Sequence, residues 1–145
     1  MEVVSIEIRY TTNEIERIKQ VDVGDWIDLR LAQDVHLEKN EFKLLSLGVA
    51  MKLPVGYEAL VIPRSSTFKN YGILQANSIG LIDESYCGNG DIWKFPAYAT
   101  REVYIPKNTR ICQFRILKHQ SHIMFTDVLE LSDKDRGGFG STGKK

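Results

Sequence analysis

The sequence predicts an all-β sandwich or barrel, and three observations lead to that prediction. Short apolar runs alternate with polar residues at the two-residue period of a half-buried strand, as over 4–10. Glycine, proline and asparagine separate these runs at short intervals. Only 13–20 and 65–70 have a helical pattern, and neither is longer than one or two turns. Many short strands without a long helix indicate an all-β fold.

The expected elements follow one another along the whole chain. The first strand lies over 4–10, where Val, Ile and Tyr alternate with Ser, Glu and Arg. We expect Ser65 to cap the short helix at 65–70. Pro96 and an extra turn within 88–99 are expected to interrupt a strand, with Trp93 in the core. The remaining expected strands are 26–32, 43–53, 57–62, 73–75, 79–82, 92–95, 101–105, 111–117 and 122–128.

Bulk composition excludes several function classes. With 43% hydrophobic and 26% charged residues, the 145-residue chain has the make-up of a soluble globular domain. Lys plus Arg and Asp plus Glu both number 19, so no basic footprint points to a nucleic-acid polymer. Two cysteines and three scattered histidines indicate neither a disulfide framework nor a zinc site. Short apolar runs and an acidic N-terminus predict no membrane span, no signal peptide and a cytoplasmic location.

The string DKDRGGFGSTG at 133–143 has the residue types of a flexible phosphate clamp. Its glycines allow backbone N–H groups to turn onto an anion, and its hydroxyls add donors. GFGSTGK at 138–144 matches a P-loop by letter, but Lys145 stands where that motif has Ser or Thr. The GxGxxG match has no βαβ unit after it. We therefore expect a lid over a site built elsewhere, and the alternative is a disordered tail.

A second set of ligand-type residues follows the strand at 57–62. Arg64, Ser65 and Ser66 lie in a turn where a guanidinium, hydroxyls and backbone N–H groups can converge on phosphate oxygens. The plainer interpretation is a helix cap with a surface arginine. The residues around 75–78 are expected to form a hairpin whose edge can pair with a base.

Asp83 and Tyr86 complete this region. Asp83 follows an apolar run, so we expect partial desolvation, raised basicity and a role as general base toward water. An ordinary aspartate in a β-turn is the alternative. Tyr86 is positioned to stack against a sugar, or else packs as a core or surface ring.

Five strings in order resemble the motifs of the trimeric deoxyuridine triphosphatase (dUTPase) family. They are IDLRLA at 27–32, IPRSS at 62–66, NSIGLIDESYCG at 77–88, TRICQ at 109–113 and GGFGSTG at 137–143. The resemblance implies a jelly-roll-like β-barrel over 1–131 and a flexible arm over 132–145. It further implies a homotrimer in which each arm closes a neighbouring subunit's site.

The resemblance also implies a reaction and roles for residues. The reaction is hydrolysis of dUTP to dUMP and pyrophosphate, which clears dUTP and supplies dUMP. Asp83 is then the catalytic residue that positions the attacking water, and Asp28 supports hydrated Mg²⁺ through water. The implied substrate-binding residues are Arg64, Ser65, Ser66, Asn77, Leu81, Ile82, Tyr86, Asp91, Gln113, Arg136, Phe139, Gly140, Ser141 and Thr142.

Departures from the family pattern leave some points open. The family places an arginine five residues before the lid phenylalanine, whereas this chain has Lys134 there and Arg136 three residues before Phe139. Either cation is therefore a candidate for the γ-phosphate. The alternatives to a dUTPase are a dCTP deaminase-like relative, with Glu84 as proton shuttle, and a nucleotide-sensing protein that docks on a regulatory protein partner. If the chain is such a nucleotide-sensing protein, we expect its docking surface at 88–99 and 13–20.

Overall fold

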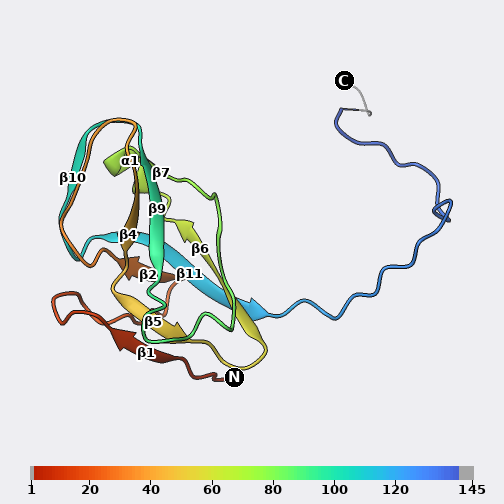
Figure 1. The fold of residues 1–145 in the computed structure, drawn as a ribbon, viewed down its shortest axis with the longest axis horizontal. Helices are drawn as coiled ribbons and strands as arrows, with labels where there is room; N and C mark the ends of the chain where they lie inside the picture. The colour runs from red at the N-terminus through yellow and green to blue at the C-terminus, as the bar shows by residue number, and fades with distance from the viewer. Residues whose placement is uncertain (1, 141–145) are drawn as a thin grey trace.

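The computed structural model describes residues 2–140, which form short strands and one short helix (Figure 1). No helix among these residues is long and apolar enough to cross a membrane. The elements in chain order are β1 (Glu7–Tyr10), β2 (Ile27–Arg30), β3 (Val35–Leu37), β4 (Phe42–Ser46), β5 (Val49–Lys52), β6 (Tyr57–Pro63), α1 (Thr67–Tyr71), β7 (Ile73–Gln75), β8 (Gly80–Ile82), β9 (Lys94–Ala99), β10 (Val103–Ile105) and β11 (Arg110–Lys118).

The strands form two main antiparallel sheets and two paired ribbons. One sheet has the order β2-β11-β6-β8 and the other β4-β9-β7, while β1 pairs with β5 and β3 with β10. Both main sheets contribute buried side chains to one core, and Trp93 meets Phe114 edge-on with ring centroids 5.2 Å apart. The all-β prediction is confirmed, as is the burial of Trp93. The ladders form four separate sheets within residues 2–140, so they do not close into one continuous barrel.

The register of the four-stranded sheet positions the polar side chains. Asp28 is paired with Gln113, and Gln113 is paired with Ile62. Directly paired residues of antiparallel strands point to the same face, and the adjacent Leu29 and Cys112 are fully buried. Asp28 and Gln113 therefore lie side by side on the face turned away from the core.

The expected strand at 43–53 is two strands in different sheets. Gly48 breaks it, because its φ of 73° lies in the left-handed region that favours glycine. The residues on either side stay bonded to one partner, since Leu47 N–H donates to Trp93 O and Trp93 N–H donates to Val49 O. The chain therefore bends within the apolar run 43–53, and Gly48 is the local sign of the bend in the sequence.

Two expectations for the middle of the chain are wrong. Strands β7 and β8 are not a hairpin, because β7 pairs with β9 and β8 pairs with β6, so the turn at 75–78 crosses between sheets. Pro96 lies inside β9 and does not interrupt it. Its carbonyl accepts from Ala76 N–H just beyond the end of β7, so the N–H that proline lacks falls where that ladder has ended.

Two further segments were predicted wrongly. Residues 13–20 are not helical, because their N–H groups bond elsewhere: Glu16 N–H donates to Asn108 and Ile18 N–H donates to the Tyr10 hydroxyl. Residues 122–128 are exposed and do not form a strand, since they run outside the body (Figure 1). Strand β3 was missed because three residues are too short to show a period.

We predict that Gly48→Ala destabilises the fold more than Gly24→Ala. Both glycines have positive φ, so each substitution costs about 1 kcal/mol in backbone strain. A Cβ at Gly48 would lie 3.0 Å from Ile15 Cδ1 and 3.1 Å from Ala32 Cβ, whereas a Cβ at Gly24 meets nothing within 4 Å. Overpacking should therefore raise the Gly48→Ala cost to at least about 2 kcal/mol.

Urea denaturation of both variants at one protein concentration measures the difference. Equal losses in the free energy of unfolding would show that Ile15 and Ala32 make room for the added Cβ without further destabilisation.

Candidate active site

One group of predicted residues gathers around Asp28 on β2. Its Oδ1 lies 3.2 Å from Arg64 Nε and its Oδ2 lies 3.3 Å from Arg110 Nη1. Gln113, beside it on β11, donates from Nε2 to Pro63 O at 3.1 Å. A carboxylate with a cation on each oxygen leaves an excess of positive charge, and an incoming polyanion can open the arrangement because its own oxygens can take the guanidinium donors.

Arg64 is held by a buried threonine beneath it. Thr67 Oγ1 accepts from Arg64 N–H at 2.9 Å and donates to Ile111 O at 2.8 Å, with Thr67 itself buried. The expected cap is wrong in detail, because Ser66 and not Ser65 is the N-cap of α1, and it makes no side-chain cap bond. The Ser66 hydroxyl is thus not engaged in capping and remains a candidate ligand group beside Arg64.

A cavity of about 330 Å³ adjoins Asp28 and brings in cations that the sequence analysis did not single out. Arg30 lines it and is paired with Glu16 at 2.9 Å. Arg110 lies within TRICQ at 109–113, so that string was the available signal for it. The complete lining is Glu16, Arg17, Ile18, Lys19, Val21, Trp26, Asp28, Arg30 and Arg110.

Asp83 lies in a tight turn after β8 that its own side chain helps to fix. Its Oδ1 accepts from Ser85 N–H at 2.8 Å and from Ser85 Oγ at 2.6 Å, and Tyr86 N–H donates to Asp83 O at 3.0 Å. These contacts leave Oδ2 without a partner among residues 2–140. Oδ1 is therefore the anchored oxygen and Oδ2 the one that can hold a ligand or water.

The expectation of raised basicity at Asp83 is wrong. The side chain is exposed, and the hydroxyl and backbone N–H of Ser85, followed by the nearby charge of His119, lower the pKa of Asp83 below its ordinary value. Asp83 is thus ionised at neutral pH. An ionised carboxylate can accept a hydrogen bond from a water molecule, hold it in one orientation and take its proton as that water reacts.

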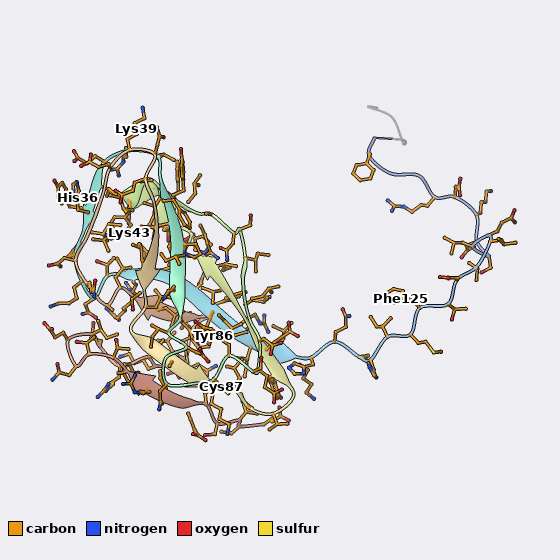
Figure 2. The ribbon with its side chains drawn as sticks, in the orientation of Figure 1. His36, Lys39, Lys43, Tyr86, Cys87 and Phe125 are labelled. Carbon is orange, nitrogen blue, oxygen red and sulfur yellow. The ribbon has the colours of Figure 1, made fainter. Side chains whose placement is uncertain are left out.

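A pocket of about 380 Å³ opens beside Asp83. The Tyr86 hydroxyl donates to Ile92 O at 3.0 Å, which fixes the ring as a wall of this pocket; Figure 2 labels Tyr86 and the neighbouring Cys87. Asp91 lies nearby and caps its own turn, since its Oδ2 accepts from Gly88 N–H at 2.8 Å. The lining is Leu81, Ile82, Asp83, Ser85, Tyr86, Ile92, Trp93 and Lys94.

Asn77 lies at the tip of the turn between β7 and β8 and is exposed. The turn is tight, because Ile79 N–H donates to Asn77 O at 2.6 Å and Ser78 has a φ of 62°. Buried Gln75 secures its base, with Nε2 donating to Val61 O at 3.0 Å. The segment predicted to read the base is therefore fixed to the body at Gln75 and exposed to solvent at Asn77.

The structure does not bring Asp83 next to Asp28. Asp28 is level with Ile62 across the sheet, whereas Asp83 follows Ile82, which pairs with Ala59. The two aspartates are thus separated by about four residues along the strands, at ~3.3 Å each, and by about three strand spacings of ~4.8 Å, which is roughly 20 Å in all. One copy of the chain thus holds the predicted site residues as two separate groups, the Asp28 half-site and the Asp83 half-site.

The C-terminal arm lies away from both half-sites. After β11 the chain runs out from the body, and Phe125 projects from it into solvent (Figures 1 and 2). Lys134, Arg136, Phe139 and Gly140 are all exposed. The predicted ligands Ser141 and Thr142 lie outside the described residues.

Two places in the described chain merit consideration for a metal. His36, Glu38 and Glu102 have ligand atoms within 4.8 Å of one another. They are a surface ion-pair cluster in which His36 also stacks on Tyr104 with centroids 4.2 Å apart, far from Tyr86 (Figure 2). Asp28 fits Mg²⁺ differently, because this ion keeps several waters and takes one or two carboxylates together with phosphate oxygens.

Comparison with known proteins identifies one family. The dUTPase family model matches residues 13–143. The SPbeta prophage-derived deoxyuridine 5'-triphosphate nucleotidohydrolase YosS of Bacillus subtilis is 56% identical over 140 residues, which cover 97% of this chain and 99% of that protein. The deoxyuridine 5'-triphosphate nucleotidohydrolase of Thermobifida fusca is 33% identical, covering 97% of this chain and 79% of that protein.

Solved structures agree on the fold. The Staphylococcus bacteriophage 80alpha dUTPase with dUPNHPP superimposes with a TM-score of 0.81 at 18% identity, covering 98% of this chain and 100% of that one. The dUTPase from Streptococcus mutans gives a TM-score of 0.71 at 18% identity, with 81% and 98% coverage. The expected jelly-roll-like fold is therefore confirmed.

We predict that Ser85→Ala raises the pKa of Asp83. The substitution removes the hydroxyl donor, which is the largest cause of the lowered pKa, and leaves the backbone donor in place. Titration of the Asp83 carboxyl carbon by NMR in both proteins measures the shift. The wild-type midpoint should lie at lower pH than the variant midpoint, and coincident midpoints would show that the hydroxyl does not hold the carboxylate.

Proposed function

The chain belongs to the dUTPase family, and on that premise we propose that it hydrolyses dUTP to dUMP and pyrophosphate. The observation that carries the proposal is an ionised Asp83 with one free oxygen at the mouth of a pocket of about 380 Å³. The relatives named for this activity align with almost the whole chain, at 56% identity in the case of YosS.

Asp83 would act through its free oxygen. With Oδ1 held by Ser85, Oδ2 accepts a hydrogen bond from a water molecule and aims it at the α-phosphorus. A new bond forms between the water oxygen and this phosphorus while the bond to the bridging oxygen of the leaving pyrophosphate breaks. The water proton passes to Asp83, and a positioned base of this kind contributes roughly 10²- to 10⁴-fold to the rate.

The Asp28 group would hold the triphosphate. Arg64 and Arg110 exchange the Asp28 carboxylate for phosphate oxygens, and the Gln113 amide and the Ser66 hydroxyl add neutral donors. Asp28 is thereby released to support water on Mg²⁺. When bound, Mg²⁺ would neutralise the charge that develops on the leaving pyrophosphate.

We propose that two copies of the chain contribute to each site, within a homotrimer. The separation of roughly 20 Å between Asp28 and Asp83 is more than side chains can bridge within one chain, so the Asp28 group of one copy would meet the Asp83 group of another. The face around β8 supports this, since Leu81 is 70% exposed and Ile79 is 50% exposed. Exposed apolar side chains gathered at one place are typical of an interface.

The C-terminal arm would close the site from a neighbouring copy. Phe139 is fully exposed in the single chain and needs a flat apolar partner, which the uracil ring supplies. The glycines around it and Arg136 or Lys134 bring N–H groups and positive charge to the phosphates. Tyr86 would pack on the deoxyribose and exclude a 2′-hydroxyl, and the tight turn at Asn77 would exclude the thymine methyl.

The dCTP deaminase alternative is less well supported. It needs a glutamate free to move protons beside the base, and Glu84 was the candidate. The Glu84 carboxylate is instead bonded to Gly56 N–H at 2.9 Å and lies 3.2 Å from His119. It is also absent from the lining of the pocket that Tyr86 borders.

A regulatory protein partner stays a proposal, with a narrower surface than the sequence suggested. Phage dUTPases, the Staphylococcus bacteriophage 80alpha protein among them, are described as controlling transfer of virulence genes. In this chain, Trp93, Phe95, Ala97 and Ala99 are buried, so the continuous exposed stretch within 88–99 is 88–90, with Lys94 exposed on its own. The segment 13–20 is exposed except at Ile15 and Ile18 and stays a candidate surface.

We predict that Asp83→Asn keeps nucleotide affinity and loses roughly 10²- to 10⁴-fold in kcat. The amide fills the same space but cannot accept the water proton. Product analysis with Mg²⁺ and dUTP, dCTP, dTTP or UTP tests activity and selectivity, and dUPNHPP binding tests affinity. Asp22→Asn, an exposed loop change, is the control. Turnover of Asp83→Asn at the wild-type rate would remove Asp83 from the mechanism, and release of ammonia from dCTP would favour the deaminase.

We also predict that two inactive variants complement each other. In randomly mixed trimers of Asp83→Asn and Arg64→Ala chains, about a quarter of the sites combine an intact Asp83 with an intact Arg64 from another copy. Co-refolding the two variants in equal amounts should therefore restore about a quarter of wild-type activity. If both residues serve a site within one chain, the mixture stays inactive.

A further inference from the structure

We propose that Glu84 and His119 are a positioning pair that ties the turn carrying Asp83 to the root of the C-terminal arm. The inference rests on the proposed function, because it assigns the pair a purpose in presenting Asp83. Neither residue belongs to the two half-sites described above, and both line a separate pocket of about 420 Å³ that also contains Asp83.

Glu84 and His119 lie in contact beside a hydrogen bond from the histidine. His119 Nε2 lies 2.9 Å from Tyr57 O and 3.2 Å from Glu84 Oε1. The Tyr57 carbonyl can only accept, so Nε2 carries a hydrogen and donates it there, while the Glu84 carboxylate lies against the same ring nitrogen. Glu84 Oε1 also accepts from Gly56 N–H at 2.9 Å. One carboxylate oxygen thus connects the Asp83 turn, the turn before β6 and His119.

His119 is also where the arm leaves the body. Strand β11 ends at Lys118, and His119 N–H donates to Gly56 O at 2.9 Å. Over residues 120–140 every side chain is exposed and no bond to the body is formed. His119, which anchors the start of the arm, therefore also contacts Glu84, the residue that follows Asp83 in the chain.

The remaining bonds of the Asp83 turn do not replace this tie. The Ser85 bonds and the Tyr86 N–H to Asp83 O bond lie within the turn, so they set its shape and not its place on the body. The Tyr86 hydroxyl anchors the other side at Ile92. The β6–β8 ladder ends at Ile82, so beyond it Glu84 supplies the anchor on the β6 side, and losing this anchor would free the Asp83 carboxylate to move.

The charges around His119 agree with this arrangement. Glu84 and Asp83 face it from the turn, and Lys52 lines the same pocket from β5. Asp83 and His119 line the same pocket, so the two side chains face one space. His119 sets the direction in which the arm leaves the body, and it contacts Glu84 beside Asp83. The arm that closes over a neighbouring site is therefore linked to the Asp83 turn.

Four variants test the pair: His119→Ala, His119→Gln, Glu84→Ala and the double alanine variant. A misplaced catalytic group can cost up to about 10²-fold, and we expect kcat to fall about tenfold in each single alanine variant. Glutamine keeps an N–H donor at a similar reach and should stay within about twofold of wild type. Because the residues act as one unit, the double variant should be no slower than either single one. His122→Ala, an exposed arm histidine, is the control.

A second readout does not depend on turnover. Hydrogen exchange of the Gly56 and Tyr86 amides should quicken in His119→Ala and Glu84→Ala and stay at the wild-type rate in His119→Gln and His122→Ala. If wild type does not hydrolyse dUTP, the proposed function fails while this exchange pattern still decides whether the tie exists. Unchanged exchange, or additive kcat losses in the double variant, would overturn the inference.

Discussion

The register of the four-stranded sheet β2-β11-β6-β8 is the constraint on which the site depends. Backbone bonds fix Asp28 at the level of Ile62 and place Asp83 beyond Ile82, at the far edge of the same sheet. No rotamer change can close a gap of roughly 20 Å, because side chains reach only a fraction of it. The sheet therefore keeps the Arg64–Asp28 group and Asp83 apart within one chain, and under the proposed function a second copy brings them together.

Each half is held by a different kind of support. Arg64 is fixed from below, by a buried threonine bonded to the neighbouring strand, so its backbone belongs to the core. Asp83 is exposed and depends on bonds from the Ser85 hydroxyl and backbone N–H and on the proposed tie through Glu84. The Asp83 turn is thus the less deeply anchored of the two, which agrees with the proposal that it meets a second copy of the chain.

The sequence was sufficient for the fold class and most strand locations, because period-two alternation and turn residues are local signals. It was insufficient where partners are distant: Gly48 ends one strand and starts another in a different sheet, and Pro96 is tolerated because β7 has already ended. At the site, the motif strings identified Arg64 and Asp83. The sign of the Asp83 pKa shift was predicted wrongly, since burial was assumed and the Ser85 bonds dominate. His119 had no local signal, because its contacts come from 57 and 84.

The size of the species that turns over dUTP tests the two-copy account most directly. Active-enzyme sedimentation, in which a thin band of protein moves through a solution of dUTP and Mg²⁺, measures the mass of the working unit as it consumes substrate. The account predicts that activity moves at about three times the 16.6 kDa mass of one chain. Activity moving with a single chain would contradict it, because one copy would then complete a site that the sheet register keeps apart.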